Sequence, residues 1–184
     1  MSRILWLLIE TLGSLLSVAC VLRAYAHRIH LNPHNPISQF VAALTDWLVG
    51  PLRRLIPPNR SMDWASVLAA FLVAVLTALL FFVVVGGVSV PNPGHVLFLA
   101  MVWLVRWTVW LVIGLVIVQA ILSWVNPYAP LAPAIQQLTQ PFLAPIRKIV
   151  PLVGGVDLSP LVLIVLLQVV LMVADPATLP GLLR

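Results

Sequence analysis

The sequence is poor in charge, in acidic residues and in cysteine. Of 184 residues, 62% are hydrophobic and 8% are charged, with 10 Lys and Arg, 5 Asp and Glu, and 1 Cys. A soluble domain carries roughly a quarter charged residues, so this chain cannot cover a globule with water-compatible side chains. The single cysteine, Cys20, excludes an intrachain disulfide and a multi-cysteine metal site. The composition therefore predicts an integral membrane protein.

Patterns typical of catalysis or cofactor binding are also missing. The sequence shows no nucleophile–base pairing, no phosphate-binding loop and no paired catalytic carboxylates, so we expect no enzymatic activity and no cofactor. His27, His30 and His34 have a spacing that on one helix could hold a metal or haem. Pro33 interrupts that helix, and we expect no metal site. The net charge is +5, and the basic residues lie beside apolar segments. This placement indicates that they contact a membrane surface rather than nucleic acid.

Four apolar segments are predicted to span the membrane, each with about 20 mostly apolar residues. They are residues 4–22, 64–88, 96–125 and 159–174, of which the last is the shortest. The first segment also resembles a signal peptide that ends in a lipoprotein-like SVAC site. Glu10 interrupts its apolar core, and Ser17 stands where such a site has an aliphatic residue. We therefore expect it to be retained as the first membrane helix.

The chain repeats itself after 94 positions. Residues 45–57 read TDWLVGPLRRLIP, and residues 139–151 read TQPFLAPIRKIVP. The repeat predicts two units, residues 1–90 and 95–184, each with a span, a long connector (residues 32–62 or 126–158) and a returning span. Two spans return the chain to its starting side. The units should therefore be parallel, related by a pseudo-twofold axis along the membrane normal.

Each connector has the 3.6-residue apolar period of an amphipathic helix. Such a helix between two spans is expected to lie in the headgroup plane. Pro51 and Pro145 are expected to break it, because proline removes a backbone hydrogen bond and crowds the preceding turn. A short basic helix should then follow. The predicted fold class is an all-α membrane protein with four transmembrane helices in two parallel repeats, each with an interfacial helix–proline–helix connector.

Basic and acidic residues recur at fixed places in the two connectors. Arg53 and Arg54 correspond to Arg147 and Lys148, and these pairs either orient the protein in the membrane or also bind anionic lipid, worth about 1 kcal/mol per basic residue. Asp63 and Asp157 each precede a returning span. A carboxylate there is expected to cap the helix, to form an ion pair with the nearby basic residues, or to do both.

The distribution of Lys and Arg predicts the topology. An excess of these residues marks cytoplasmic loops. The first connector and its flanks carry Arg23, Arg28, Arg53, Arg54 and Arg60, the second connector carries Arg147 and Lys148, and the opposite side carries Arg3 and Arg184. Both connectors are therefore expected to be cytoplasmic, with both termini on the opposite side.

Glu10 and Arg106 are the two charges expected within the spans. Charge inside a membrane is costly and indicates a functional role. The repeat places the two residues within roughly 3 Å of each other in depth, so an ion pair is geometrically feasible. The alternative is that Arg106 snorkels to the outer interface among Trp103, Trp107 and Trp110, which resemble an aromatic belt.

The second half carries a family resemblance. Asn126-Pro127, the run TQPFLAPIRKIVP and the run GGVDLSP at residues 154–160 look like the signature of the YggT family of bacterial and plastid membrane proteins. The first half keeps this frame but has PPNRSMDWAS where the pattern has a Gly-Gly pair and Asp-x-Ser-Pro. The resemblance implies a small two-repeat inner-membrane protein linked to assembly or placement of membrane complexes and to osmotic stress. It brings no catalytic residue.

These observations predict a non-enzymatic scaffold or assembly factor in the bacterial inner (plasma) membrane. Its basic connectors would contact anionic lipids of the bilayer or helices of a membrane protein partner. The alternative is a transporter or channel component, motivated by the internal symmetry together with Glu10 and Arg106. Four spans offer few polar groups to line a pore, so a conducting form would need a homo-oligomer.

Overall fold

The computed structural model describes residues 2–59, 61–84, 92–150 and 157–174, and within these ranges all regular secondary structure is helical. The helices are α1 (Ser2–Arg28), α2 (Pro36–Leu55), α3 (Trp64–Val84), α4 (Pro93–Val125), α5 (Ala132–Arg147) and α6 (Ser159–Val173). The predicted all-α class is confirmed. Four predicted features lie outside the described residues: the end of the second span at residues 85–88, connector residues 151–156, Arg60 and Arg184.

Three helices, α1, α3 and α4, are long and apolar enough to cross a membrane. α6 is also apolar but has 15 residues, about 22 Å at 1.5 Å per residue, against a hydrocarbon core about 30 Å thick. α1 passes the predicted boundary at residue 22 and ends at Arg28, with His27 and Arg28 in its last turn. Basic side chains there suit the negative end of the helix dipole, so α1 continues beyond its apolar part.

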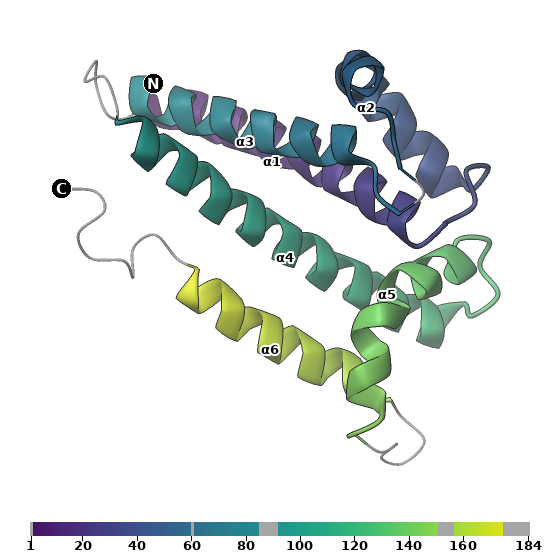
Figure 1. Ribbon diagram of the computed structural model, residues 1–184. Coiled ribbons are helices and arrows are strands. Elements are labelled where there is room, and N and C mark those ends of the chain that lie inside the picture. Colours follow the sequence, from purple (N-terminus) through teal and green to yellow (C-terminus); the bar gives the residue numbers. More distant parts are fainter. Residues whose placement is uncertain (1, 60, 85–91, 151–156, 175–184) are drawn as a thin grey trace.

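α1 and α3 lie side by side in the bundle (Figure 1), with small side chains at their contact. Ser17 Oγ on α1 donates a hydrogen bond of 3.1 Å to the carbonyl oxygen of Ala70 on α3. Gly13 lies so close to Thr77 that an added Cβ would overlap the threonine hydroxyl. Contacts at small residues allow helix backbones to approach in lipid, and the two helices pack mainly through such residues.

The connector helices α2 and α5 lie at the same end of the bundle, where α1 and α4 end and α3 and α6 begin (Figure 1). α2 begins after Asn35, whose side chain accepts a hydrogen bond from the Ile37 amide, with a proline in the first turn. One face of α2 is buried through Val41, Thr45 and Val49. A second face leaves Phe40, Leu44 and Trp47 exposed. α2 therefore packs on the bundle and also presents an apolar surface outward.

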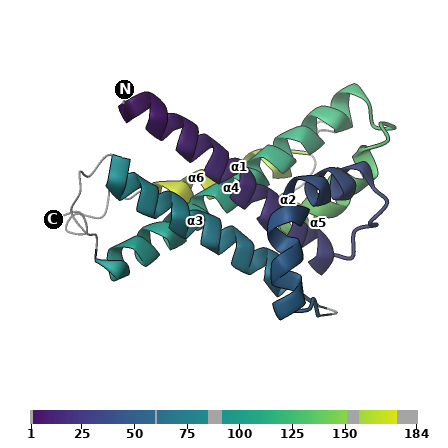
Figure 2. The same cartoon turned by 90° about the horizontal axis from the view of Figure 1, so that it is seen from above.

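Neither connector helix ends at its predicted proline break. α2 continues through Pro51 to Leu55, and α5 continues through Pro145 to Arg147. Figure 2 shows that α2 bends along its length. Bending is the usual way in which a helix accommodates the missing N–H and the bulk of a proline ring. The predicted helix–proline–helix connectors are therefore single helices whose last turn carries the basic residues.

Aromatic rings gather between α1, α3 and α4. The Trp6 ring centroid lies 5.0 Å from that of Phe81 and 5.6 Å from that of Trp103. Trp107, 6.0 Å from Trp103, is 9% exposed, whereas Trp110 is 56% exposed. Trp107 packs inside the bundle, in a buried cluster with residues of α3 and α4, whereas the aromatic belt considered for Trp103, Trp107 and Trp110 stays a prediction.

Candidate functional site

The first residue of the repeated motif joins each connector to the span before it. Thr45 and Thr139 are both fully buried. Thr45 Oγ1 accepts a hydrogen bond of 2.8 Å from Arg23 Nη1 on α1. Thr139 Oγ1 donates a hydrogen bond to Gln119 Oε1 on α4. Thus, in each half, this motif position satisfies a polar group on the preceding helix.

The first basic residue of the motif joins each connector to the helix after it. Arg53 Nη2 lies 2.5 Å from Asp63 Oδ2, immediately before α3. Arg147 Nε lies 2.8 Å from Asp157 Oδ2, just before α6. We call these two ion pairs the Arg–Asp clamps. Together with the buried threonine, each clamp fixes its connector to both neighbouring helices.

The two clamps differ in exposure. In the first clamp the Arg53 side chain is 33% exposed and the Asp63 side chain is 0% exposed. In the second clamp Arg147 is 39% exposed and Asp157 is 30% exposed. Charges interact more strongly where water is excluded, and a buried charge is costly to leave without its partner. Breaking the first clamp should therefore destabilise the fold more than breaking the second.

Both clamp carboxylates also bind the start of the following helix. Asp63 Oδ2 accepts a hydrogen bond of 2.6 Å from Ser66 Oγ, and Asp157 Oδ1 accepts one of 2.9 Å from the Ser159 amide. Burial alone raises the pKa of the Asp63 carboxyl, but hydrogen bonds from Arg53 and Ser66 and the charge of Arg53 outweigh it, leaving the pKa below its ordinary value of 3.8. The same balance of burial and hydrogen bonding lowers the pKa of Asp157. Both groups are therefore charged at neutral pH.

The second basic residue of each pair has different surroundings. Arg54 and Lys148 are exposed, although each directly follows a clamp residue in sequence. In both halves the basic pair is thus divided into an inner residue, which forms a clamp, and an outer residue, which forms no ion pair among the described residues. The inner residue Arg147 is itself exposed.

Each connector encloses a cavity against the end of the span before it. The first cavity, about 350 Å³, lies between α1 and α2 and has Arg53 in its wall. The second cavity, about 170 Å³, lies between α4 and α5 and has Arg147 in its wall. Five wall positions of the two cavities are 94 residues apart: Pro33 and Pro127, Ser38 and Ala132, Val41 and Ile135, Ala42 and Gln136, Arg53 and Arg147. The cavities therefore occupy corresponding places in the two halves.

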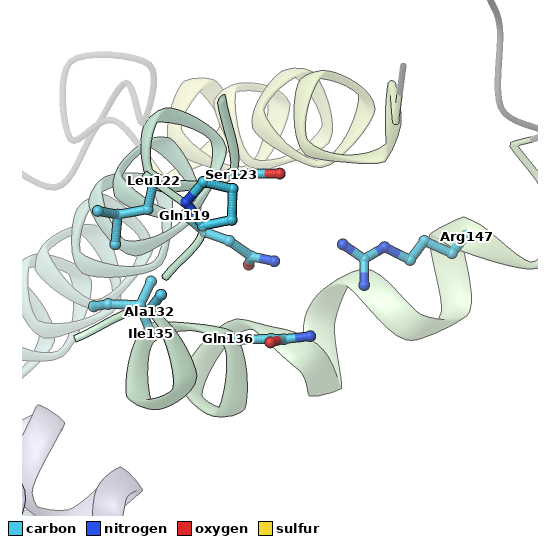
Figure 3. Close-up of a pocket in the computed structure, with 8 residues that line it drawn as sticks. Gln119, Leu122, Ser123, Ala132, Ile135, Gln136 and Arg147 are labelled. Carbon is cyan, nitrogen blue, oxygen red and sulfur yellow. The ribbon is translucent and has the colours of Figure 1, made fainter. Parts of the chain in front are cut away.

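The cavity walls are rich in hydrogen-bond donors. Figure 3 shows the second cavity, where the Arg147 guanidinium points toward the side chains of Gln119 and Gln136. The first cavity is lined by two arginines and a histidine, and the residues lining either cavity include no carboxylate. Guanidinium, amide and hydroxyl donors suit the binding of an anion or of a carbonyl oxygen.

Two residues that line the first cavity each have a polar atom without a partner. Ser38 Oγ and Arg53 Nε are buried without a hydrogen bond among the described residues, and both residues line the first cavity. A buried polar group left in this state costs about 1–3 kcal/mol. The second cavity differs at both positions, because Ala132 has no hydroxyl and Arg147 Nε donates to Asp157. The two cavities share a frame and differ in chemistry.

Glu10 and Arg106 are the predicted intramembrane charges, and their ion pair stays a prediction. Glu10 is exposed on α1, and Arg106 is half-buried on α4. Snorkelling of Arg106 stays a prediction. The three histidines do not share a helix, because α1 ends at Arg28 and His30 adopts a positive φ of 54°. His27 Nε2 lies 2.8 Å from the carbonyl oxygen of Asn59, so it joins the end of α1 to the loop before α3.

Several polar contacts were not predicted. Arg23 was counted only as a topological charge, yet its Nη2 lies 2.7 Å from Asp46 Oδ1 in addition to the bond with Thr45. The threonine repeated at positions 45 and 139 could have indicated a polar contact of this kind, since a buried hydroxyl needs a hydrogen-bond partner. Tyr25 Oη donates a hydrogen bond of 2.8 Å to the Leu138 carbonyl oxygen and so joins the two halves. No local pattern indicates this contact.

Apolar helices braced by two surface connectors define a small, all-helical membrane protein. The chain belongs to the CCB3/YggT family, whose family model matches residues 2–84 and 98–177. It is 38% identical over 162 residues to an uncharacterized protein from the proC 3' region of Vibrio alginolyticus, covering 88% of each chain. It is 36% identical over 170 residues to the uncharacterized protein YggT of Escherichia coli K12, covering 89% of this chain and 85% of the relative. No solved structure matches the chain. The family resemblance seen in the sequence is confirmed.

Proposed function

We propose that this protein is a non-enzymatic scaffold of the bacterial inner membrane that holds a partner membrane protein at its connector surface. In this proposal α6 completes a fourth span, with local thinning of the bilayer compensating for its length. Both connectors then lie in the cytoplasmic headgroup region. The excess of Lys and Arg in the connectors supports that orientation, as does the bacterial origin of the similar proteins.

The observation that carries the proposal is the division of each basic pair. The clamps hold the connector helices against the bundle, and Arg54 and Lys148 are exposed at the end of those braced helices. A positive surface that is fixed in place complements an anionic leaflet and the acidic segments of a membrane protein.

The proposal predicts that a partner is lost when the outer charges are removed. The experiment is affinity capture of the full-length protein from its source membrane in native nanodiscs, with the retained proteins identified by mass spectrometry. Wild type should retain a defined membrane protein, and the double variant Arg54→Ala/Lys148→Ala should lose most of it. The clamps are intact in this variant, so loss of the partner would not reflect loss of the fold.

The matched control exchanges the two residues without changing the charge. Arg54→Lys/Lys148→Arg keeps both positive charges at the same positions, and it should retain the partner at close to the wild-type level. Equal recovery of the same proteins with wild type and with the double alanine variant, with both inserted in the membrane, would refute the assignment of these residues to partner binding.

A further inference from the structure

An open apolar groove lies beside the first cavity. It has a volume of about 830 Å³ and runs between α1 and α2, with Leu15, Leu16, Phe40, Leu44 and Trp47 among its lining residues. The groove and the first cavity share Leu22, Ile37 and Val41 as wall residues. A polar compartment and an apolar compartment therefore meet across the same three side chains. Both volumes lie within the range of about 300–1,000 Å³ that is usual for small-molecule sites.

The unpartnered donors of the first cavity define what the polar compartment accepts. Arg53 binds Asp63 through Nη2, which leaves the buried Nε–H without an acceptor. The buried Ser38 hydroxyl has no partner either. A phosphodiester group offers several oxygen acceptors and is a favoured partner of arginine. Ser38 and Arg53 line the same cavity, so a phosphate bound there is the single acceptor that we consider for both groups.

The charge of the first cavity agrees with an anionic ligand. The residues that line it include Arg23 and Arg53 and no carboxylate, and the Asp63 carboxylate outside the lining pairs with Arg53. Arg23 is 11% exposed, whereas its ion-pair partner Asp46 is 63% exposed. Water screens a carboxylate as exposed as Asp46, so the buried guanidinium retains attraction for a second anion inside the cavity.

We propose that the first cavity and the apolar groove together bind one anionic phospholipid. Its phosphate accepts hydrogen bonds from Arg53 Nε and Ser38 Oγ, and an acyl chain lies in the groove along α1 and past Trp47. This inference rests on the membrane orientation of the proposed function. It deepens that function by naming the class of lipid that the scaffold binds. It uses neither Arg54 nor Lys148, so the lipid site and the partner surface can fail independently.

The second half does not duplicate this site. The second cavity is smaller, at about 170 Å³. Alanine replaces the serine at position 132, and Arg147 Nε is already bonded to Asp157. We therefore expect one tightly bound phospholipid per chain.

Native mass spectrometry of the purified, delipidated full-length protein tests the stoichiometry and the head group. Dioctanoyl-phosphatidylglycerol is the probe, and dioctanoyl-phosphatidylcholine is the control with the same chains and no net charge. Wild type should form a saturable one-to-one adduct with the anionic lipid in preference to the control. Ser38→Ala should weaken that adduct about tenfold, because it removes a hydrogen bond to a charged group. Arg53→Lys, which keeps the charge at the clamp but removes the Nε donor, should weaken it to a similar extent.

The chain provides matched controls for the head-group variants. Ser38→Ala copies the residue that the second half carries at position 132, so the fold is expected to tolerate it. Ala132→Ser makes the reverse change in the second cavity and should leave binding of the anionic lipid unaltered. Equal binding of the two lipids, or wild-type affinity in Ser38→Ala, would overturn the proposal. Competition by inorganic phosphate that is as strong as that by the lipid would also overturn it, in favour of a free-anion site.

Fluorescence quenching locates the acyl chain. Phosphatidylglycerol with brominated chains, added at one equivalent to the protein in detergent, should quench a component of tryptophan emission that is absent from the Trp47→Phe variant. The variant should still form the one-to-one adduct. Identical quenching in wild type and in the variant would place the chain outside the groove and contradict this part of the site.

Discussion

At the residue scale, Arg53 and Arg54 are neighbours with opposite surroundings. Arg53 lies against the fully buried Asp63, whereas Arg54 is exposed. The second half repeats the arrangement with Arg147 at Asp157 and with an exposed lysine next in sequence. The sequence predicted both basic pairs and both acids. It could not indicate which member of a pair reaches the acid, because that depends on where the bent connector places its last turn.

Because the two clamps differ in exposure, breaking each of them should lower the free energy of unfolding by a different amount. Arg53→Met removes the counter-ion of a buried carboxylate and should lower the free energy of unfolding by about 3 kcal/mol. Arg147→Met breaks a half-exposed pair and should lower it by about 1 kcal/mol or less. The measurement is unfolding of both variants in mixed micelles beside wild type. Arg53→Met/Asp63→Asn should recover part of the loss. Equal costs for the two single variants would show that burial does not distinguish the clamps.

At the element scale, the packing of α1 on α3 depends on small residues. Gly13 faces Thr77, whose Oγ1 donates a hydrogen bond of 2.8 Å to the Val73 carbonyl oxygen. Ser17 bonds to the backbone at Ala70. Since lipid gives no hydrophobic drive for helix association, close contact and hydrogen bonds of this kind hold the helices together.

Adding a methyl group should therefore change the stability of the protein differently at Gly13 and at Gly114. Gly13→Ala should destabilise the protein, by about 1–3 kcal/mol, because its Cβ overlaps the Thr77 hydroxyl. Gly114→Ala on α4 is the matched control. Nothing lies within 4 Å of the Cβ position at Gly114, so the change should be neutral or stabilise by up to about 1 kcal/mol through helix propensity. Thermal unfolding in detergent measures both, and Gly13→Ala/Thr77→Ala should be more stable than Gly13→Ala. A Gly13→Ala protein as stable as the control would contradict the described packing.

Hydropathy and the repeat predicted the helices better than they predicted helix ends. The apolar segments and the amphipathic connectors all appear as helices. α1 nevertheless extends to Arg28, because hydropathy marks where apolar residues stop and not where backbone hydrogen bonding stops. α2 bends (Figure 2) and continues through Pro51 without ending there. The cavities were not predictable at all, since their walls combine residues of two helices whose crossing is set by tertiary packing.

At the scale of the whole molecule, the two halves are joined by polar contacts at the connector end, in addition to the aromatic contacts between α1, α3 and α4. Tyr25 on α1 bonds to the Leu138 carbonyl oxygen on α5. Gln137 Nε2 donates a hydrogen bond of 3.2 Å to the carbonyl oxygen of Ile29. Leu31 of the first half belongs to the same buried cluster as Leu138. The connector end therefore contains both clamps, both cavities and a junction between the halves, and it is the part of the molecule on which the proposed function depends.

The central claim is that both braced connectors lie on one side of the membrane, and site-directed labelling tests it most directly. The chain has one cysteine, Cys20, and it is buried. In a Cys20→Ala background, single variants Arg3→Cys, Arg54→Cys, Lys148→Cys and Val173→Cys are treated with a membrane-impermeant maleimide in intact and in permeabilised cells. Arg54→Cys and Lys148→Cys should react only after permeabilisation, and Arg3→Cys and Val173→Cys should react in intact cells. Labelling of positions 54 and 148 from opposite sides would contradict the account of two parallel, equivalent connectors.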